Sequence, residues 1–449
     1  MEPGLLADLL ASVETDSLVI VCGAGLSRTD PSRVPAAAEL AQSCARTFTQ
    51  FTGMPVPDGA NVNLETLAEF FFRDHIRWRL FLEQLVKWGP FVRGPNAGHA
   101  AISDLLCCGA VRFVITTNFD TLIESAAEGM GEPIFRAALD GDEMQRRHAH
   151  RPVLKLHGCA RVDQERTVWC RAQYDPNDGD ATIRARLQSS EVWLSANLRG
   201  CHIVIVGFWS DWPHFNEALT RALRAHLPAS ITLVDISGDE ELQLKARELW
   251  NVAEILGASF RRVRTSGAEF LDELRMKYSL RFLERVLDAS IPTYKSLGGA
   301  NDNPATILPT DLNTDELYDL RRDICGVAPT EVVRERTPNN GMRGVGAVHL
   351  FVQEKGSRFW GNRYKTPGGT LIRVVNGGSD SLHRVKDRFS KGQAASDNGE
   401  VVICAATTGD GGVPPNVVRG NSGTSDDVVR PGTQARWLNF DAARAEGFC

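Results

Sequence analysis

Short apolar runs rich in Val and Ile recur between residues 17 and 264, and each ends in glycine or a polar side chain. Runs of this length and composition are typical of buried strands in a parallel sheet. The carboxyl ends of parallel strands meet at one edge of the sheet, and open α/β sheets bind their ligands there. The sequence therefore predicts an α/β fold built on a parallel sheet. The candidate strands are residues 17–22, 111–117, 152–156, 202–206, 230–236 and 258–264.

The segment after the first strand, Gly23-Ala-Gly-Leu-Ser27, has the features of a phosphate-binding loop. Gly23 and Gly25 lack Cβ atoms, so the backbone can turn tightly and approach a pyrophosphate, while N–H groups at the next helix start face the anion. The dinucleotide fingerprint would place a third glycine at position 28, where Arg28 stands, which disfavours a plain Rossmann dehydrogenase. Taken alone, the segment is equally consistent with a simple strand-to-helix turn.

Polar side chains also follow the other strands. Asn118 and His157 stand at the ends of the second and third, and this shared position favours a functional role over a structural one. Asp120 can be explained as a helix cap. The fourth strand opens into a glycine loop, Gly207 to Asp211, and the fifth ends in Asp235, which suits either a ribose hydroxyl or a turn.

The ordered combination of these motifs resembles the sirtuin family, and specifically its bacterial sirtuin-like defence branch, over about residues 10–285. The glycine loop matches the family's nucleotide loop, Thr117-Asn118-Phe119-Asp120 its Gln-Asn-Ile-Asp segment, and His157-Gly158 its catalytic His-Gly. The resemblance implies a Rossmann-like sheet with an inserted helical lobe, NAD as substrate, and Asn118 and His157 as the catalytic pair. The residues expected to bind NAD are Gly23, Ala24, Gly25, Ser27, Thr117, Asp120, Gly207, Asp211 and Asp235.

The sequence also departs from the family pattern. Protein-deacylating sirtuins carry a structural zinc site of two Cys-x-x-Cys pairs after the His-Gly, whereas this region offers only Cys159 and Cys170. A tetrahedral cysteine site cannot be assembled locally from two cysteines, so no zinc is expected. The family's arginine-containing stretch is replaced by residues 28–35, and the choice between Arg28 and Arg33 as a ligand contact stays open.

These departures favour an NAD+ glycohydrolase that releases ADP-ribose and nicotinamide. The resemblance implies an anti-phage role through NAD depletion, a homo-oligomer, and partners such as a hexameric HerA-like DNA-translocase ATPase or a short Argonaute. An NAD-dependent protein deacylase is one alternative, disfavoured by the missing cysteine pairs. A non-catalytic sensor of NAD or ADP-ribose that gates a partner is the other, disfavoured because a sensor has no need of Asn118 and His157 together.

The chain has 449 residues, 43% of them apolar and 24% charged, and can bury more than one core. We expect a catalytic domain over 1–290 with a helical insertion at about 36–100, a linker over 291–316, and a smaller C-terminal α+β domain over 317–449 that suits oligomer or partner docking. No apolar run is long enough to span a membrane, no signal-like start is present, and the ten cysteines are scattered. These features predict a cytoplasmic protein.

The C-terminal region contains three β-like runs, at 346–352, 370–375 and 400–405. Residues 331–391 hold 12 Lys or Arg against 5 Asp or Glu, with aromatic residues among them, in a chain whose net charge is −6. Nucleic-acid binding is one interpretation of this stretch. A solvated face or a dock for an acidic partner is the other.

Overall fold

A computed structural model describes residues 1–133, 137–147, 151–208, 220–221, 227–302, 304, 306–390, 400–405 and 435–449. The chain divides into two compact units, Met1–Leu274 and Arg275–Cys449. Within these described ranges, no helix is both long and apolar enough to cross a membrane.

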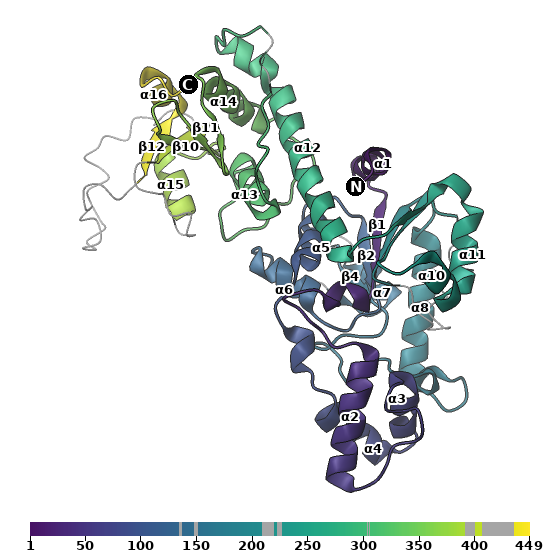
Figure 1. Ribbon diagram of the computed structural model, residues 1–449. Coiled ribbons are helices and arrows are strands. Elements are labelled where there is room, and N and C mark those ends of the chain that lie inside the picture. The colour runs from purple at the N-terminus through teal and green to yellow at the C-terminus, as the bar shows by residue number, and fades with distance from the viewer. Residues whose placement is uncertain are drawn as a thin grey trace, which may run out of the picture. The chain divides into compact units, whose positions relative to one another are not determined.

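The first unit is built on a seven-stranded parallel sheet with the order β3-β4-β2-β1-β5-β6-β7 (Figure 1). With the two-residue edge strand β3 set aside, this is the strand order of the Rossmann fold, in which the direction of winding reverses beside β1. The predicted α/β fold is confirmed, and β3 is the strand that the sequence did not predict. The bounds are β1 Leu18–Cys22, β2 Phe113–Thr116, β3 Ala137–Ala138, β4 Val153–Lys155, β5 His202–Val206, β6 Ser230–Val234 and β7 Phe260–Val263.

Helices cover both faces of this sheet, which explains why its central strands are apolar throughout. On one face, side chains of the strands pack with Trp193, Leu194, Leu242 and Leu249 in a continuous core. The helices of the sheet region are α1 Pro3–Glu14, α5 Ala97–Cys107, α6 Leu122–Gly129, α7 Gly141–Arg146, α8 Ala181–Asn197, α10 Asp239–Lys245 and α11 Arg247–Ile255, with short 3-10 segments at Ala24–Arg28, Arg171–Tyr174 and Gly257–Ser259.

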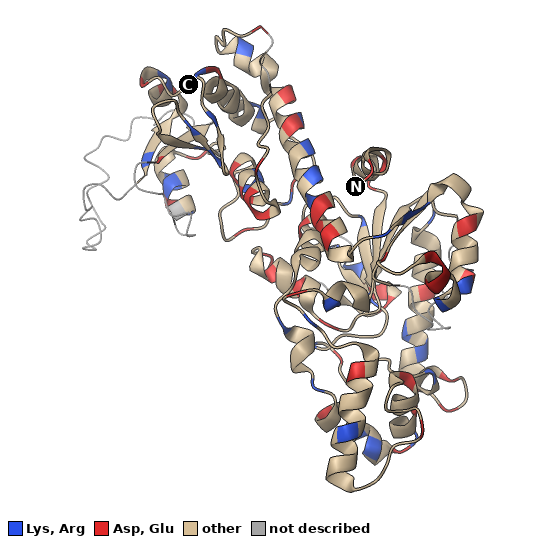
Figure 2. Ribbon diagram, viewed as in Figure 1, with Lys and Arg blue, Asp and Glu red and all other residues tan. Residues whose placement is uncertain are grey.

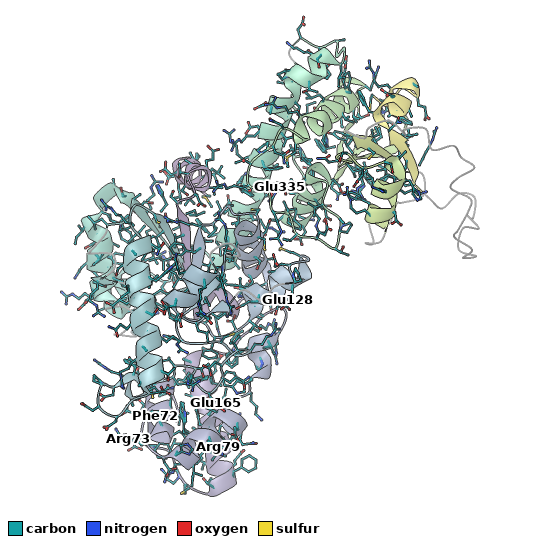
Figure 3. The ribbon with its side chains drawn as sticks, turned by 180° about the vertical axis from the view of Figure 1, so that it is seen from behind. Phe72, Arg73, Arg79, Glu128, Glu165 and Glu335 are labelled. Carbon is teal, nitrogen blue, oxygen red and sulfur yellow. The ribbon has the colours of Figure 1, made fainter. Side chains whose placement is uncertain are left out.

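The predicted helical lobe is inserted between β1 and β2, and its apolar core also includes Leu122, Ala160, Trp169 and Cys170. Figure 3 shows Phe72, Arg73 and Arg79 in this lobe, beyond the sheet. The lobe is made of several short helices because Asn63 and Asp74 each cap a new helix with a side-chain oxygen. Its elements are α2 Ala37–Thr52, α3 Leu64–Phe72, α4 His75–Leu80, a π-helical turn Phe81–Leu85 and a 3-10 turn Gly89–Val92.

The second unit contains a five-stranded mixed sheet in the order β12-β11-β10-β9-β8. Strands β10, β11 and β12 are parallel, whereas β8, β9 and β10 are antiparallel neighbours. The C-terminal α+β prediction is confirmed. The bounds are β8 Arg358–Trp360, β9 Arg363–Lys365, β10 Leu371–Asn376, β11 Val401–Ala405, β12 Arg436–Asn439, α13 Thr314–Cys325, α14 Met342–Glu354, α15 Leu382–Ser390 and α16 Phe440–Ala445.

Two details differ from the sequence predictions. The run 346–352 forms part of helix α14 and not a strand, because that helix is buried on every side and its apolar residues are therefore continuous. Gly346 allows α12, Gly267–Ser296, to pack closely, since a Cβ there would lie 2.1 Å from Ser290 Oγ. Helix α12 also continues through Pro292 to Ser296, well past the expected end near Leu287.

Candidate functional site

The ends of β4, β2 and β1 bring the predicted catalytic side chains to one edge of the sheet. Thr116 of β2 pairs with Lys155 of β4, and Asn118 and His157 each stand two residues further along. Neighbouring strands lie about 4.8 Å apart, so the two residues leave the sheet side by side at the same level. Both are partly exposed, as groups that meet a ligand must be.

The loops after β1 and β5 interlock at the point where the winding of the sheet reverses. The Gly25 N–H donates to Gly207 O at 2.9 Å, and a Cβ on Gly25 would lie 2.8 Å from Gly207 Cα. Gly207 has φ +55°, and a Cβ there would lie 2.5 Å from Leu26 N. These glycines are therefore required by the packing of one loop on the other, a reason that the sequence alone does not give.

The segment after Gly23 is a five-residue 3-10 turn, Ala24–Arg28, and not the start of a long helix. The Leu26 N–H donates to Gly23 O at 3.0 Å, as the Gly25 N–H does to Gly207 O. Two of the N–H groups that the sequence assigned to an anion are thus used within the protein.

Ser27 lies at the centre of a buried hydrogen-bond network. Its hydroxyl donates to Asp120 Oδ2 at 2.8 Å, and Asp120, a carboxylate, can only accept. Ser27 Oγ must then accept from its other neighbours, so the Asn118 atom at 3.1 Å is the NH2 group. This contact fixes the orientation of the Asn118 amide, and its carbonyl oxygen is the atom left to face a ligand.

His99 is the third partner of Ser27, with 3.2 Å between Nε2 and Oγ. The Asn96 N–H donates to His99 Nδ1 at 3.2 Å, so Nδ1 carries no proton and Nε2–H is the donor to Ser27. Burial lowers the pKa of His99 from 6.5 to about 4, which keeps this tautomer neutral. His99 was not predicted from the sequence. The signal available was the Asn96–His99 spacing, since these residues form a reciprocal cap at the start of α5.

A buried ion pair of Lys155 and Glu124 is joined to this network through Asp120. Lys155 Nζ lies 2.9 Å from Glu124 Oε1, with the two side chains 1% and 0% exposed, and it also donates to the backbone oxygen of Asp120. Burial raises the pKa of Glu124. Asp120 is held further by the Leu122 N–H, which donates to its Oδ1 at 3.2 Å in an Asx turn, whereas the N-cap of α6 is Thr121.

Two predicted ligand aspartates follow β5 and β6 in the sequence, and two arginines were considered as ligand contacts. Asp235 follows β6, and its Oδ1 accepts from the Ser237 N–H at 2.8 Å, which is the turn that the sequence offered as an alternative. Asp211 lies outside the described residues. Arg28 binds Glu39 and Val34 O, and Arg33 pairs with Asp30 on the surface.

Aromatic side chains pack beside the two segments that carry Asn118 and His157. The Phe119 ring, next to Asn118, lies 4.6 Å from that of Trp169 and 4.7 Å from that of Phe91, centroid to centroid. Trp169 in turn lies 5.5 Å from Phe81 of the lobe. The preceding residue, Val168, donates its N–H to the His157 carbonyl oxygen at 2.8 Å.

Cys159 and Cys170, the two cysteines after the His-Gly, are both buried free thiols. Burial raises the pKa of Cys170 to about 12, which disfavours the thiolate that zinc binding requires. Among the residues that the structure describes, no three His, Cys, Asp or Glu side chains come together as a metal site. Two buried cysteines do not make up the four-cysteine zinc site of protein-deacylating sirtuins.

Residues 112–255 match the family model of the SIR2-like domain. The match begins at β2 and ends within α11, and it contains Asn118, Asp120 and His157. It supports NAD-related chemistry for this part of the first unit. A search of curated proteins finds no match.

Solved structures of Sir2 proteins are also similar to the chain. A Sir2 homologue mutant in complex with ADP ribose is 18% identical, with 61% of this chain and 95% of that chain covered and a TM-score of 0.34. Sir2 bound to an acetylated peptide is 15% identical, with 62% and 98% covered and a TM-score of 0.32. Sir2 with a p53 peptide and NAD+ is 17% identical, with the same coverage and a TM-score of 0.33.

Proposed function

We propose that the first unit is an NAD+ glycohydrolase that cleaves NAD+ to ADP-ribose and nicotinamide. The observation that carries this proposal is the network in which Asp120, Ser27 and His99 hold the amide of Asn118 at the strand end next to that of His157. The SIR2-like match over residues 112–255 supports NAD as the substrate.

The reaction requires a positioned water and tolerance of positive charge. The bond between the ribose C1′ and the nicotinamide nitrogen breaks, the electron pair leaves with nicotinamide, and a water oxygen adds to C1′. The transition state is cation-like, so a neutral amide oxygen facing it is favourable. Because the Asn118 NH2 is bound to Ser27, its carbonyl oxygen is available to hold that water.

His157 is suited to remove the proton. An imidazole nitrogen can accept a proton, either from the attacking water or from a ribose hydroxyl. His99 cannot share this role, because both of its ring nitrogens are hydrogen-bonded and burial lowers its pKa to about 4.

The test is NAD+ turnover by the full chain, with products separated by chromatography in the presence and absence of an acetylated peptide. We expect nicotinamide and ADP-ribose without peptide, and loss of both in Asn118→Ala and His157→Ala. Asn177→Ala and His75→Ala, which change the same residue types at exposed positions, serve as controls and should keep full turnover.

The other outcomes separate the alternatives. Turnover only with peptide, giving acetyl-ADP-ribose, would establish a protein deacylase. Binding of NAD+ without turnover, in a chain assembled with any oligomer or partner it forms, would establish a sensor. Retained hydrolysis in Asn118→Ala or His157→Ala would refute the assignment of these residues.

We further propose that this activity serves anti-phage defence by NAD depletion in the cytoplasm, through a homo-oligomer or a partner such as a HerA-like DNA-translocase ATPase or a short Argonaute. The support is the resemblance of the motifs, with the second unit as the docking candidate. Bacteria that express the chain should lose NAD and restrict phage on infection, and those that express Asn118→Ala should do neither.

A further inference from the structure

The hairpin of β8 and β9 presents basic and aromatic side chains on one face of the second sheet. A two-residue turn joins the strands, with Gly361 first at φ +58°. Its register pairs Arg358 with Lys365 and Trp360 with Arg363. Cross-strand partners share a face of a sheet, so these four side chains project from the same face.

The opposite face of the hairpin belongs to the core. Tyr364 is 1% exposed, its ring lies 4.2 Å from that of Phe359, and its strand partner Ile372 is fully buried. The alternation along each strand therefore separates an apolar inner face from a basic outer one.

The outer face is accessible. Trp360 is 57% exposed, and Arg358 and Lys365 are exposed as well. The Lys365 ammonium lies 5.3 Å from the centroid of the Trp360 ring, which places this cation at the indole. Arg363 is occupied by Glu400. Arg358 and Lys365, a cross-strand pair without an acidic partner among the described contacts, thus lie on one side of an exposed aromatic ring.

Helix α15 covers the other end of this face. Val385 and Phe389 of the helix pack with Val375, Val402 and Trp437 of β10, β11 and β12. The outer surface of α15 is also basic, with Arg384 and Lys386 exposed, and Figure 2 shows Lys and Arg on this helix. The hairpin and α15 together carry six of the twelve Lys and Arg residues of 331–391.

We propose that the outer face of the β8–β9 hairpin binds single-stranded nucleic acid, with a base stacked on Trp360 and phosphates at Arg358 and Lys365. Exposed aromatic rings beside cations are the recurring means of binding single strands. An acidic protein partner would require an apolar interface core. Apart from Trp360, the large exposed apolar side chains among the described residues of this unit are Leu297 and Ile307, which precede α13.

The experiment measures the fluorescence anisotropy of labelled single-stranded DNA and RNA oligonucleotides with the full chain, from about 50 to 200 mM salt. We expect binding that weakens with salt and is tighter for single strands than for duplex. Trp360→Ala should weaken it by about fivefold or more, and Trp360→Phe should restore most of it. Lys365→Met should lower the slope of log affinity against log salt by about 0.7.

Lys295→Glu is the matched control, because it changes an exposed lysine near the end of α12 and should leave binding unchanged. Equal binding by wild type and Trp360→Ala would overturn the proposal. So would affinity for polyglutamate as high as for oligonucleotide, or no binding at the lowest salt. Circular dichroism of each variant shows that the fold is kept. NAD turnover is not a readout, so the result is independent of the proposed hydrolase.

Discussion

Ser27→Ala tests the hydrogen-bond network on which the candidate site depends. Ser27 is 1% exposed and serves three partners, of which His99 and Asp120 are 1% and 5% exposed. A buried polar group that loses its partner costs about 1–3 kcal/mol. The substitution leaves two such groups, so we expect the free energy of unfolding of the first unit to fall by about 2–6 kcal/mol. Asn118 is partly exposed, and water can replace its lost acceptor.

Ser103→Ala is the matched control. Ser103 is fully buried and donates a single hydrogen bond, to Ile123 O at 2.6 Å, so its removal should cost about 1 kcal/mol. Native-state hydrogen exchange at the amides of β1 and β2 measures the local free energy in both variants. A loss in Ser27→Ala no larger than in Ser103→Ala would refute the network as a source of stability.

The same variant separates stability from activity. Without Ser27 Oγ, nothing in the network fixes the orientation of the Asn118 amide, and a misplaced reacting group costs about 100-fold in rate. We therefore expect NAD+ turnover to fall by about this factor at temperatures where the chain stays folded, while Ser103→Ala keeps wild-type turnover. Unchanged turnover in folded Ser27→Ala would show that Asn118 is held by other contacts.

Three further predictions concern the surroundings of the site. Burial lowers the pKa of His99 from 6.5 to about 4 in the folded chain. Between these pH values the unfolded chain binds the proton more tightly, so the free energy of unfolding falls as the pH falls, by up to about 3 kcal/mol. Urea unfolding of His99→Gln should lack that part of the pH dependence. Lys155→Met should destabilise the first unit by about 3–5 kcal/mol, because it leaves Glu124 buried without its cation, and adding Glu124→Leu should recover much of the loss in thermal unfolding. Gly207→Ala should cost more than Gly53→Ala, since both have positive φ but only the former would place a Cβ against the β1 loop; equal melting temperatures would contradict the interlocked loops.

The sequence predicted the first sheet well because its strands are short, β-branched and bounded by glycine or polar residues. The same criterion failed for α14, whose continuous apolar run comes from burial on every side and not from strand geometry. The close helix packing at Gly346 could not be predicted either, because it depends on Ser290, more than 50 residues away in the sequence. Local composition cannot report contacts of this kind.

The candidate site shows the same limit. Asn118 and His157 were predicted because each follows a strand, a position that sequence can show. His99 was not, because it lies in the first turn of a helix that is buried on nearly every side and reaches Ser27 only through the tertiary fold. Asp120 was predicted to bind a ligand or to cap a helix. The structure adds a third role, because its carboxylate accepts the hydrogen bond from the Ser27 hydroxyl.

The aromatic residues of the inserted lobe gain a more specific meaning from the structure. Most of them pack in the apolar core of the lobe. Trp169 lies outside the lobe and contacts both Phe81 of the lobe and Phe119, which follows Asn118. Its neighbour Val168 binds the backbone of His157. The lobe is thus packed against the segments that carry both proposed catalytic residues.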